Sequence, residues 1–188
     1  FNSKRFGLDN DKILDVVLVA TPVSILCART YYVIFDGVKI NSIGEFFGFG
    51  DSSGFSGLAI YGGVIGAFAS GAVMCYIKKI KILDMFDIGA IGFLIGQGIG
   101  RWGNFMNGEA FGYETDWFCR MGLQNPLTAG QYMEVHPTFL YESLWNFLGF
   151  ALINIFYKHR KYDGQVFLLV FAWYGLGRMF IEGLRTDS

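Results

Sequence analysis

An arginine lies beside two amides and a carboxylate in the stretch 96–112, which reads GQGIGRWGNFMNGEAFG. If the chain is helical here, Arg101, Asn104 and Asn107 share one face, and Glu109 follows closely. A guanidinium group stays charged and presents a planar fork of donors that matches carboxylate or phosphate oxygens. The stretch is therefore a candidate anion site. The alternative is an interfacial cap whose arginine extends to water.

A second polar stripe lies near the end of the chain, in the stretch WYGLGRMFIEGLR. Helical spacing places Tyr174, Arg178 and Glu182 one above the other, and Arg185 lies one turn beyond. Ionisable residues inside a membrane are costly and usually functional. The alternative is that Arg178 and Glu182 only pair with each other.

The first stretch also matches the dinucleotide-binding pattern G-x-G-x-x-G at Gly98, Gly100 and Gly103. That pattern indicates a nucleotide site only where it follows a strand and opens a helix. Here it follows an apolar segment of membrane-spanning character, so the sequence excludes this interpretation.

The composition is that of a membrane protein. Of the 188 residues, 53% are hydrophobic and only 16% are charged, whereas a soluble domain has about 25% charged residues. The net charge of −1 gives no basic field for a nucleic-acid partner. Three widely spaced cysteines, Cys27, Cys75 and Cys119, fit buried apolar residues better than a disulfide framework.

Five apolar segments are long enough to approach or reach the roughly 20 residues that a spanning helix needs. They predict an all-α, polytopic membrane bundle with spans at Ile13–Phe35, Gly57–Ile77, Ile82–Gly100, Thr138–Tyr157 and Gln165–Ile181. The chain starts without methionine and stops abruptly. We therefore expect a single membrane domain, 1–188, that lacks a first and a last span of a fold of about seven. Residues 106–135 are expected to form a small outward-facing cap.

Basic residues gather in alternate loops between these segments, and they predict the orientation. Cytoplasmic loops carry an excess of lysine and arginine. The three basic loops hold Lys4, Arg5, Lys12, Lys78, Lys79, Lys81, Lys158, Arg160 and Lys161. The intervening loops 36–56 and 101–137 then face outward, as does the end of the chain at 183–188.

Small residues recur at every fourth position in two of the segments. Such series let membrane helices approach closely, and they predict helix contacts through Gly92, Gly96 and Gly100 and through Gly62, Gly66 and Ser70.

Further polar residues lie at the outer ends of two spans. His136 opens the fourth span, where Tyr141 and Glu142 follow, and a glutamate inside the membrane needs a partner. Tyr61 stands before a Gly-Gly pair at the outer end of the second span, and its phenol either donates to a phosphate or anchors at the interface. His136 and His159 lack partner spacing, and no aspartate pair suggests a magnesium site, so no metal site is expected.

Two spans thus each bring an arginine to the same outer leaflet, where a lipid phosphate is the natural anion. The chain here resembles the prolipoprotein diacylglyceryl transferases, integral inner-membrane enzymes of bacteria. The resemblance rests on RWGNFMNGE from Arg101 with Gly112 in register, HPTFLYE from His136, Tyr174 to Arg185, and the pair Gly62-Gly63. Together these blocks cover about residues 59–186.

The resemblance implies a reaction without metal or cofactor. A diacylglyceryl group passes from phosphatidylglycerol to the thiol of the lipobox cysteine of a prolipoprotein, and glycerol phosphate leaves. Arg101 would hold the lipid phosphate, and Arg178 would stabilise the leaving group or lower the pKa of the thiol. The supporting residues implied are Asn104, Asn107, Glu109, Gly112, Tyr174 and Glu182, with less defined roles for Gly62, Gly63, His136, Tyr141, Glu142 and Arg185.

One position departs from the family pattern. Many members carry a histidine, proposed as the general base, immediately before the Gly-Gly pair, whereas this chain has Tyr61. A tyrosine is a poor base at neutral pH, so the base stays unassigned. Two other functions fit the sequence less well. A phosphotransferase of CDP-linked lipids needs an aspartate-rich metal motif, and a transporter with an anion site would carry polar residues on both sides of the membrane midplane.

Overall fold

The computed structural model describes residues 7–35, 43–46, 58–124 and 131–185. Several predicted features lie outside these ranges: Lys4, Arg5, Gly57, most of the loop 36–56, residues 125–130 of the cap and the last three residues. The chain divides into two compact units, 1–85 and 86–188. Each unit is described by itself, and the single membrane domain remains a prediction.

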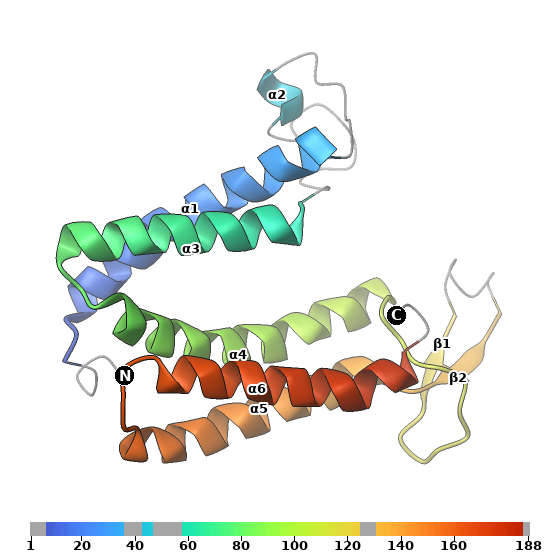
Figure 1. Cartoon of the computed structure of the whole chain (residues 1–188). Coiled ribbons are helices and arrows are strands. Elements are labelled where there is room, and N and C mark those ends of the chain that lie inside the picture. The colour runs from blue at the N-terminus through green and yellow to red at the C-terminus, as the bar shows by residue number, and fades with distance from the viewer. Residues whose placement is uncertain (1–6, 36–42, 47–57, 125–130, 186–188) are drawn as a thin grey trace. The chain divides into compact units, whose positions relative to one another are not determined.

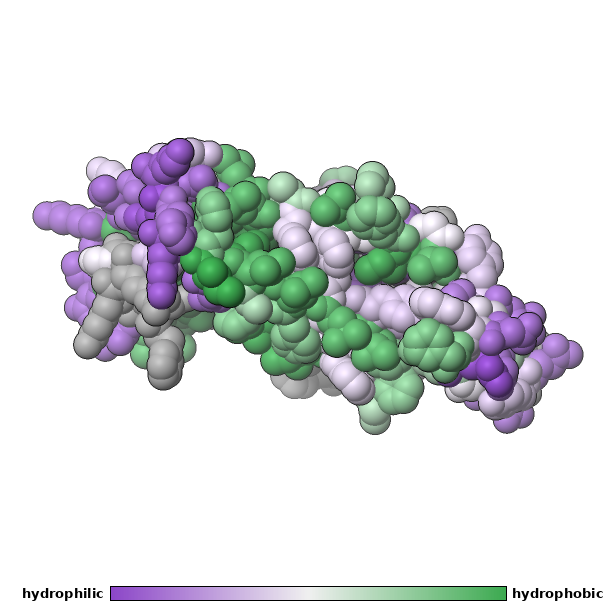
Figure 2. Space-filling model, turned by 90° about the horizontal axis from the view of Figure 1, so that it is seen from below, coloured by the Kyte–Doolittle hydropathy of each residue, from purple (hydrophilic) through white to green (hydrophobic). Residues whose placement is uncertain are grey.

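Five helices of the described chain are long and apolar enough to cross a membrane, which confirms the all-α bundle with five spans. They are α1 (Asn10–Phe35), α3 (Ile60–Lys78), α4 (Ile82–Asn107), α5 (Thr138–Phe156) and α6 (Gln165–Ile181). Many large apolar side chains on these helices are exposed, as a lipid-facing surface requires. On the face over α5 and α6, hydrophobic residues cover the middle of the helices and hydrophilic residues gather at both ends (Figure 2).

The first unit is built on close packing of α1 against α3, which lie side by side in Figure 1; it also holds the short α2 (Ile43–Phe46). A β-carbon at Gly62 or Gly66 would collide with α1 at Cys27, so the predicted small-residue contact is confirmed there. Ser24 Oγ donates to the carbonyl of Gly63 at 2.7 Å across the same contact. Glycine is required because the two backbones approach directly.

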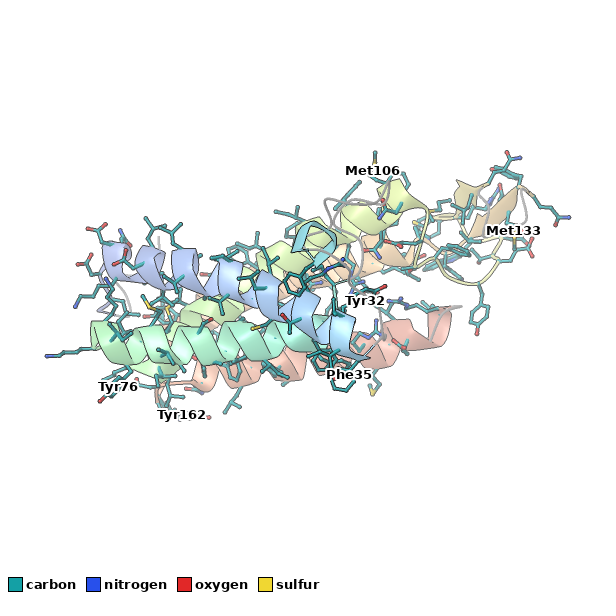
Figure 3. The ribbon with its side chains drawn as sticks, turned by 90° about the horizontal axis from the view of Figure 1, so that it is seen from above. Tyr32, Phe35, Tyr76, Met106, Met133 and Tyr162 are labelled. Carbon is teal, nitrogen blue, oxygen red and sulfur yellow. The ribbon has the colours of Figure 1, made fainter. Side chains whose placement is uncertain are left out.

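The second unit contains α4 from residue 86, α5 and α6, with the short 3-10 turns η3 (Tyr157–His159) and η4 (Glu182–Leu184) after α5 and α6. Strands β1 (Met121–Leu123) and β2 (Met133–Val135) pair antiparallel within the cap. Figure 3 shows Met106, at the end of α4, and Met133, on β2, toward one end of this unit, with Tyr162 at the other.

Two tryptophans lock α5 to α6. The rings of Trp145 and Trp173 stack at 4.3 Å, and each indole N–H donates to the backbone carbonyl of the other residue, at 3.1 and 3.0 Å. Gly149 and Gly177 leave the room for these rings. The arrangement satisfies both indole donors inside the membrane, where an unpaired N–H is costly.

A buried aspartate joins α4 to the start of α6 at the end away from the cap. Asp87 is fully buried. Its Oδ1 accepts from the backbone N–H of Phe167 at 2.8 Å, and its Oδ2 accepts from that of Gly164 at 3.0 Å and from Arg160 at 3.1 Å. An anion at a helix N-terminus satisfies its free amides, so Asp87 fixes where α6 begins.

The structure corrects the expected end of α4. The helix does not end at Gly100 but continues to Asn107, and Gly108 ends it with a φ of +64°. Within the second unit, the series Gly92, Gly96 and Gly100 contacts neither α5 nor α6, because a β-carbon there meets nothing within 4 Å, and its helix contact stays a prediction. The glycine that does pack is Gly98, which faces the ring of Phe147 on α5.

Candidate active site: three arginines around a buried glutamate

A buried glutamate on α5 forms ion pairs with three arginines of the second unit. The Glu142 side chain is only 7% exposed. Its Oε2 lies 2.6 Å from Nη2 of Arg101, and its Oε1 lies 3.3 Å from Nη1 of Arg185 and 3.8 Å from Nη1 of Arg178. The sequence predicts that this carboxylate needs a partner, and the structure supplies three.

Each arginine reaches the cluster from a different element. Arg101 lies on α4 within its last two turns, Arg178 lies in the last turn of α6, and Arg185 follows η4 in an extended conformation. Arg178 also pairs with Glu182 one turn away. The pairing of Arg178 with Glu182 is therefore present, but it is not the whole of the site.

Arginines outnumber carboxylates among the described residues of the cluster. Three guanidinium groups face the carboxylates of Glu142 and Glu182 there, and arginine does not lose its proton under physiological conditions. Arg101 and Arg178 are 20% and 31% exposed, whereas Arg185 is 11% exposed. An anionic ligand can therefore reach Arg101 and Arg178.

The cap holds Arg185 in place through backbone contacts. Gly112 bridges to Arg185, and its N–H donates to the carbonyl of His136 at 3.0 Å. Tyr113 donates its N–H to the carbonyl of Leu184 at 3.0 Å. A β-carbon at Gly112 would lie 2.7 Å from both the Leu184 carbonyl oxygen and the His136 β-carbon, so only glycine fits between them.

A match over residues 1–188 to the sequence model of the family described as prolipoprotein diacylglyceryl transferase decides the family. This chain belongs to it. Three similar relatives are named phosphatidylglycerol–prolipoprotein diacylglyceryl transferase. That of Clostridioides difficile (strain 630) is 43% identical over 187 residues, which cover 99% of this chain and 71% of the relative. The enzyme of Clostridium novyi (strain NT) is 42% identical over 193 residues, which cover 99% of this chain and 72% of the relative. The enzyme of Bacillus cytotoxicus is 41% identical over 197 residues, which cover 98% of this chain and 69% of the relative.

As a diacylglyceryl transferase of this family, the chain is a transferase, and the match does not favour the alternative of a transporter. The spans fit a multi-pass membrane protein. The arginines of its two motifs, Arg101 and Arg178, meet at Glu142 of the HPTFLYE block. Three sequence blocks that lie far apart in the chain therefore form one site in this transferase.

The other residues of the transferase's first motif lie beside the cluster without joining it. The backbone carbonyl of Asn104 accepts a hydrogen bond from the backbone N–H of Glu109 at 3.0 Å. This bond folds the chain back after α4. Asn107 and Glu109 are exposed, and the amide of Asn107 donates to Glu109 Oε1 at 3.1 Å. Among the described residues, neither side chain hydrogen-bonds one of the arginines.

An aromatic group adjoins the first turn of α5. His136 Nδ1 lies 3.3 Å from the hydroxyl of Tyr141, and the Trp117 ring meets both side chains edge-on at 6.1 and 6.5 Å. The sequence singles out His136 and Tyr141 but not Trp117. Nothing in the spacing of Trp117 indicates this contact, because it depends on how the cap folds back over α5.

Two tyrosines of the expected site are exposed. Tyr174 lies one turn before Arg178 on α6 and is 37% exposed. Tyr61 belongs to the first unit, is 74% exposed, and lies 6.4 Å from Tyr31 between ring centres. The neighbouring Gly62 is explained by its close approach to α1. The role of Tyr61 in the transferase stays a prediction.

Proposed function

We propose that this chain transfers the diacylglyceryl group of phosphatidylglycerol to a prolipoprotein, and that the arginines around Glu142 bind the lipid phosphate. The names of the relatives give the donor and the acceptor. The observation that carries the placement is the convergence of Arg101, Arg178 and Arg185 on one buried carboxylate. The site needs neither a cofactor nor a metal for this chemistry.

The charge of the cluster suits the change of charge in the reaction. The phosphodiester of the donor carries one negative charge, and the glycerol phosphate that leaves carries up to two. An enzyme accelerates a step when it binds the transition state more tightly than the ground state. A fixed excess of positive charge beside the phosphate therefore stabilises the charge that develops as the bond breaks.

The transfer is a displacement at carbon. The thiolate of the lipobox cysteine attacks the glycerol carbon that bears the phosphate oxygen. A carbon–sulfur bond forms, the carbon–oxygen bond breaks, and its electron pair leaves with glycerol phosphate. The thiol proton must first pass to a base. Arg178 favours the thiolate by its charge. The identity of the base stays open, because Tyr61 stands where many family members carry a histidine.

Smaller roles follow for the residues near the arginines. Asn104, Asn107 and Glu109 shape the part of the pocket that takes the headgroup, and Tyr174 orients the substrate one turn before Arg178. Glu182 supports Arg178 by pairing with it. Gly112 lets the cap approach close enough to fix Arg185.

Glu142 serves as the counter-ion that assembles the site. Three guanidinium groups would repel one another if no carboxylate lay between them. A buried carboxylate with good partners keeps them near one point, so little reorganisation is required when the phosphate arrives. Glu142 is therefore a positioning residue in this proposal, and it does not touch the reacting atoms.

The orientation that we propose places the site toward the outer leaflet of the bacterial inner membrane. The end of the second unit opposite the cluster carries Lys158, Arg160 and Lys161 next to η3. Basic residues favour the cytoplasmic side, which puts the cluster and the cap on the other side. The lipobox of a translocated signal peptide would meet the enzyme at that depth.

The transfer itself is tested with the purified chain in detergent micelles containing phosphatidylglycerol. The acceptor is a lipobox peptide, and the control is the same peptide with serine in place of cysteine. We expect mass spectrometry to find a diacylglyceryl adduct on the cysteine peptide alone, with release of glycerol phosphate. Equal modification of both peptides by the membrane-extracted chain, or modification of neither, would contradict the proposed function.

A further inference from the structure

A threonine at the start of α5 donates a hydrogen bond to the loop that follows α4. Thr138 is fully buried, and its Oγ1 donates to the backbone carbonyl of Ala110 at 2.5 Å. The methyl group of Thr138 adjoins Gly112, where an added β-carbon would lie 3.1 Å from Cγ2 of the threonine. Both branches of this side chain therefore face the loop 108–112.

The loop has an uncommon backbone conformation. Gly108 has a φ of +64°, and Ala110, two residues later, has a φ of +54°. Glycine takes this left-handed conformation freely, whereas alanine takes it only where its surroundings hold it there. Lys79, the other described non-glycine residue with a positive φ, is the ordinary left-handed residue after α3. Ala110 is instead a strained residue inside a loop, and such residues gather at functional sites.

The strained loop leads directly to the contacts that place Arg185. Gly112 bridges to Arg185, and Tyr113 donates its N–H to the carbonyl of Leu184 at 3.0 Å. A different conformation at Ala110 would redirect the chain just before these contacts. Arg185 would then lose the backbone support that holds it beside the cluster.

Thr138 and Glu142 lie one turn apart, on the same face of α5. Glu142 Oε1 lies 3.3 Å from Nη1 of Arg185, while Thr138 bonds the loop that supports the same arginine. We infer that Thr138 is a positioning residue for transfer: its hydroxyl holds Ala110 in the left-handed conformation and so keeps Arg185 within the arginine cluster. This inference rests on the proposed function and deepens it.

The test separates the hydroxyl of Thr138 from its methyl group. Thr138→Val removes only the hydroxyl, and Thr138→Ser removes only the methyl group. The control, Thr30→Val, removes a hydroxyl that donates to the carbonyl of Leu26 within α1 at 2.7 Å. We expect Thr138→Val to lose about 5- to 10-fold in kcat/KM per folded enzyme, as loss of one hydrogen bond does. Thr138→Ser and Thr30→Val should stay close to wild type.

Two further variants distinguish positioning from a merely structural role. In an Arg185→Ala background there is no guanidinium group to place, so Thr138→Val should cost little more in kcat/KM. Ala110→Gly should restore most of the rate to Thr138→Val, because glycine takes the positive φ without help from the hydroxyl. Additive losses in the Arg185→Ala background, or a wild-type rate for Thr138→Val, would overturn the inference.

Amide hydrogen exchange of the loop, followed by mass spectrometry in detergent, gives a measurement that does not depend on transfer. The N–H groups of Gly112 and Tyr113 are bonded to carbonyls of other segments. We expect them to exchange faster in Thr138→Val and at the wild-type rate in Thr30→Val. Unchanged exchange in Thr138→Val would overturn the inference even where transfer is normal. Faster exchange in that variant, with a wild type that transfers nothing, would instead contradict the proposed function.

Discussion

The two carboxylate oxygens of Glu142 contact arginines from two different segments of the second unit. Oε2 lies 2.6 Å from Nη2 of Arg101 on α4, and Oε1 lies 3.3 Å from Nη1 of Arg185 after α6. One side chain of α5 therefore ties both neighbouring segments together at the end of the membrane helices. The same contacts set the spacing of the arginines, so we expect both stability and catalysis to depend on this one residue.

Glu142→Gln should lower both properties. The substitution leaves three buried or half-buried cations without their shared counter-ion, and removal of one partner of a buried ion pair costs about 3–5 kcal/mol. We expect a lower free energy of unfolding in detergent and a fall in kcat for diacylglyceryl transfer of at least about tenfold.

The matched control for this prediction is Glu134→Gln, which removes the partner of Arg120 in the cap. That ion pair is well exposed, with side chains 36% and 43% accessible, and such a pair contributes at most about 1 kcal/mol. Equal losses for both variants would show that Glu142 has no special place in the site.

Gly112→Ala should impair transfer by moving Arg185. The added methyl group would lie 2.7 Å from the carbonyl oxygen of Leu184, a backbone atom that cannot rotate away. We expect at least about a tenfold loss of kcat/KM, because small displacements of a positioned group have large kinetic effects. Gly183→Ala, whose methyl group would meet nothing within 4 Å, serves as the control and should retain activity. Wild-type activity of Gly112→Ala would contradict the role of this contact.

Two glycines of α6 offer a test of the tryptophan pair. The methyl group of Gly177→Ala would collide with the indole nitrogen of Trp145. The methyl group of Gly175→Ala, two residues earlier, would meet nothing within 4 Å. Overpacking of this kind costs about 1–3 kcal/mol. Thermal unfolding in detergent should therefore show a lower Tm for Gly177→Ala alone. A Tm unchanged from wild type would mean that α5 and α6 adjust freely.

The proposed orientation predicts which cysteine is reached from outside. Cys119 lies in the cap and is half-buried. In a Cys27→Ala, Cys75→Ala background, a membrane-impermeant maleimide should label Cys119 in intact spheroplasts. The control adds Lys158→Cys and Cys119→Ala to that background, and should be labelled only after lysis. The reverse pattern would place the site on the cytoplasmic side.

Much of the fold follows from the sequence because membrane helices are specified by length and hydropathy. The span Gln165–Ile181 has the same bounds in the structure, and Thr138 opens α5 as expected. The prediction that the third span ends at Gly100 was wrong. Glycine ends helices less reliably in a membrane, because the backbone groups there must form their hydrogen bonds within the helix. Only Gly108, with its positive φ, ends the helix.

The sequence predicts the arginines of the candidate site but not the carboxylate of Glu142 at which they meet. Arg101 and Arg178 follow from their cost inside a membrane, which makes them stand out. Their meeting at Glu142 depends on the packing of α5 between α4 and the end of α6, and no spacing in the sequence encodes such a contact. The Gly92 series has no partner within the second unit, and a small-residue pattern does not itself specify its partner.

The phosphate of the donor lipid is the ligand that we propose for the arginine cluster. Arg101→Ala is compared with Arg120→Ala, which removes an exposed arginine of the cap. Transfer of labelled diacylglyceryl from phosphatidylglycerol to a lipobox peptide is measured at equal amounts of membrane-inserted enzyme. We expect Arg101→Ala to lose at least about a hundredfold in kcat/KM, as removal of a positioned electrostatic group does, while Arg120→Ala stays close to wild type. Transfer by Arg101→Ala at the wild-type rate would contradict the proposed phosphate site.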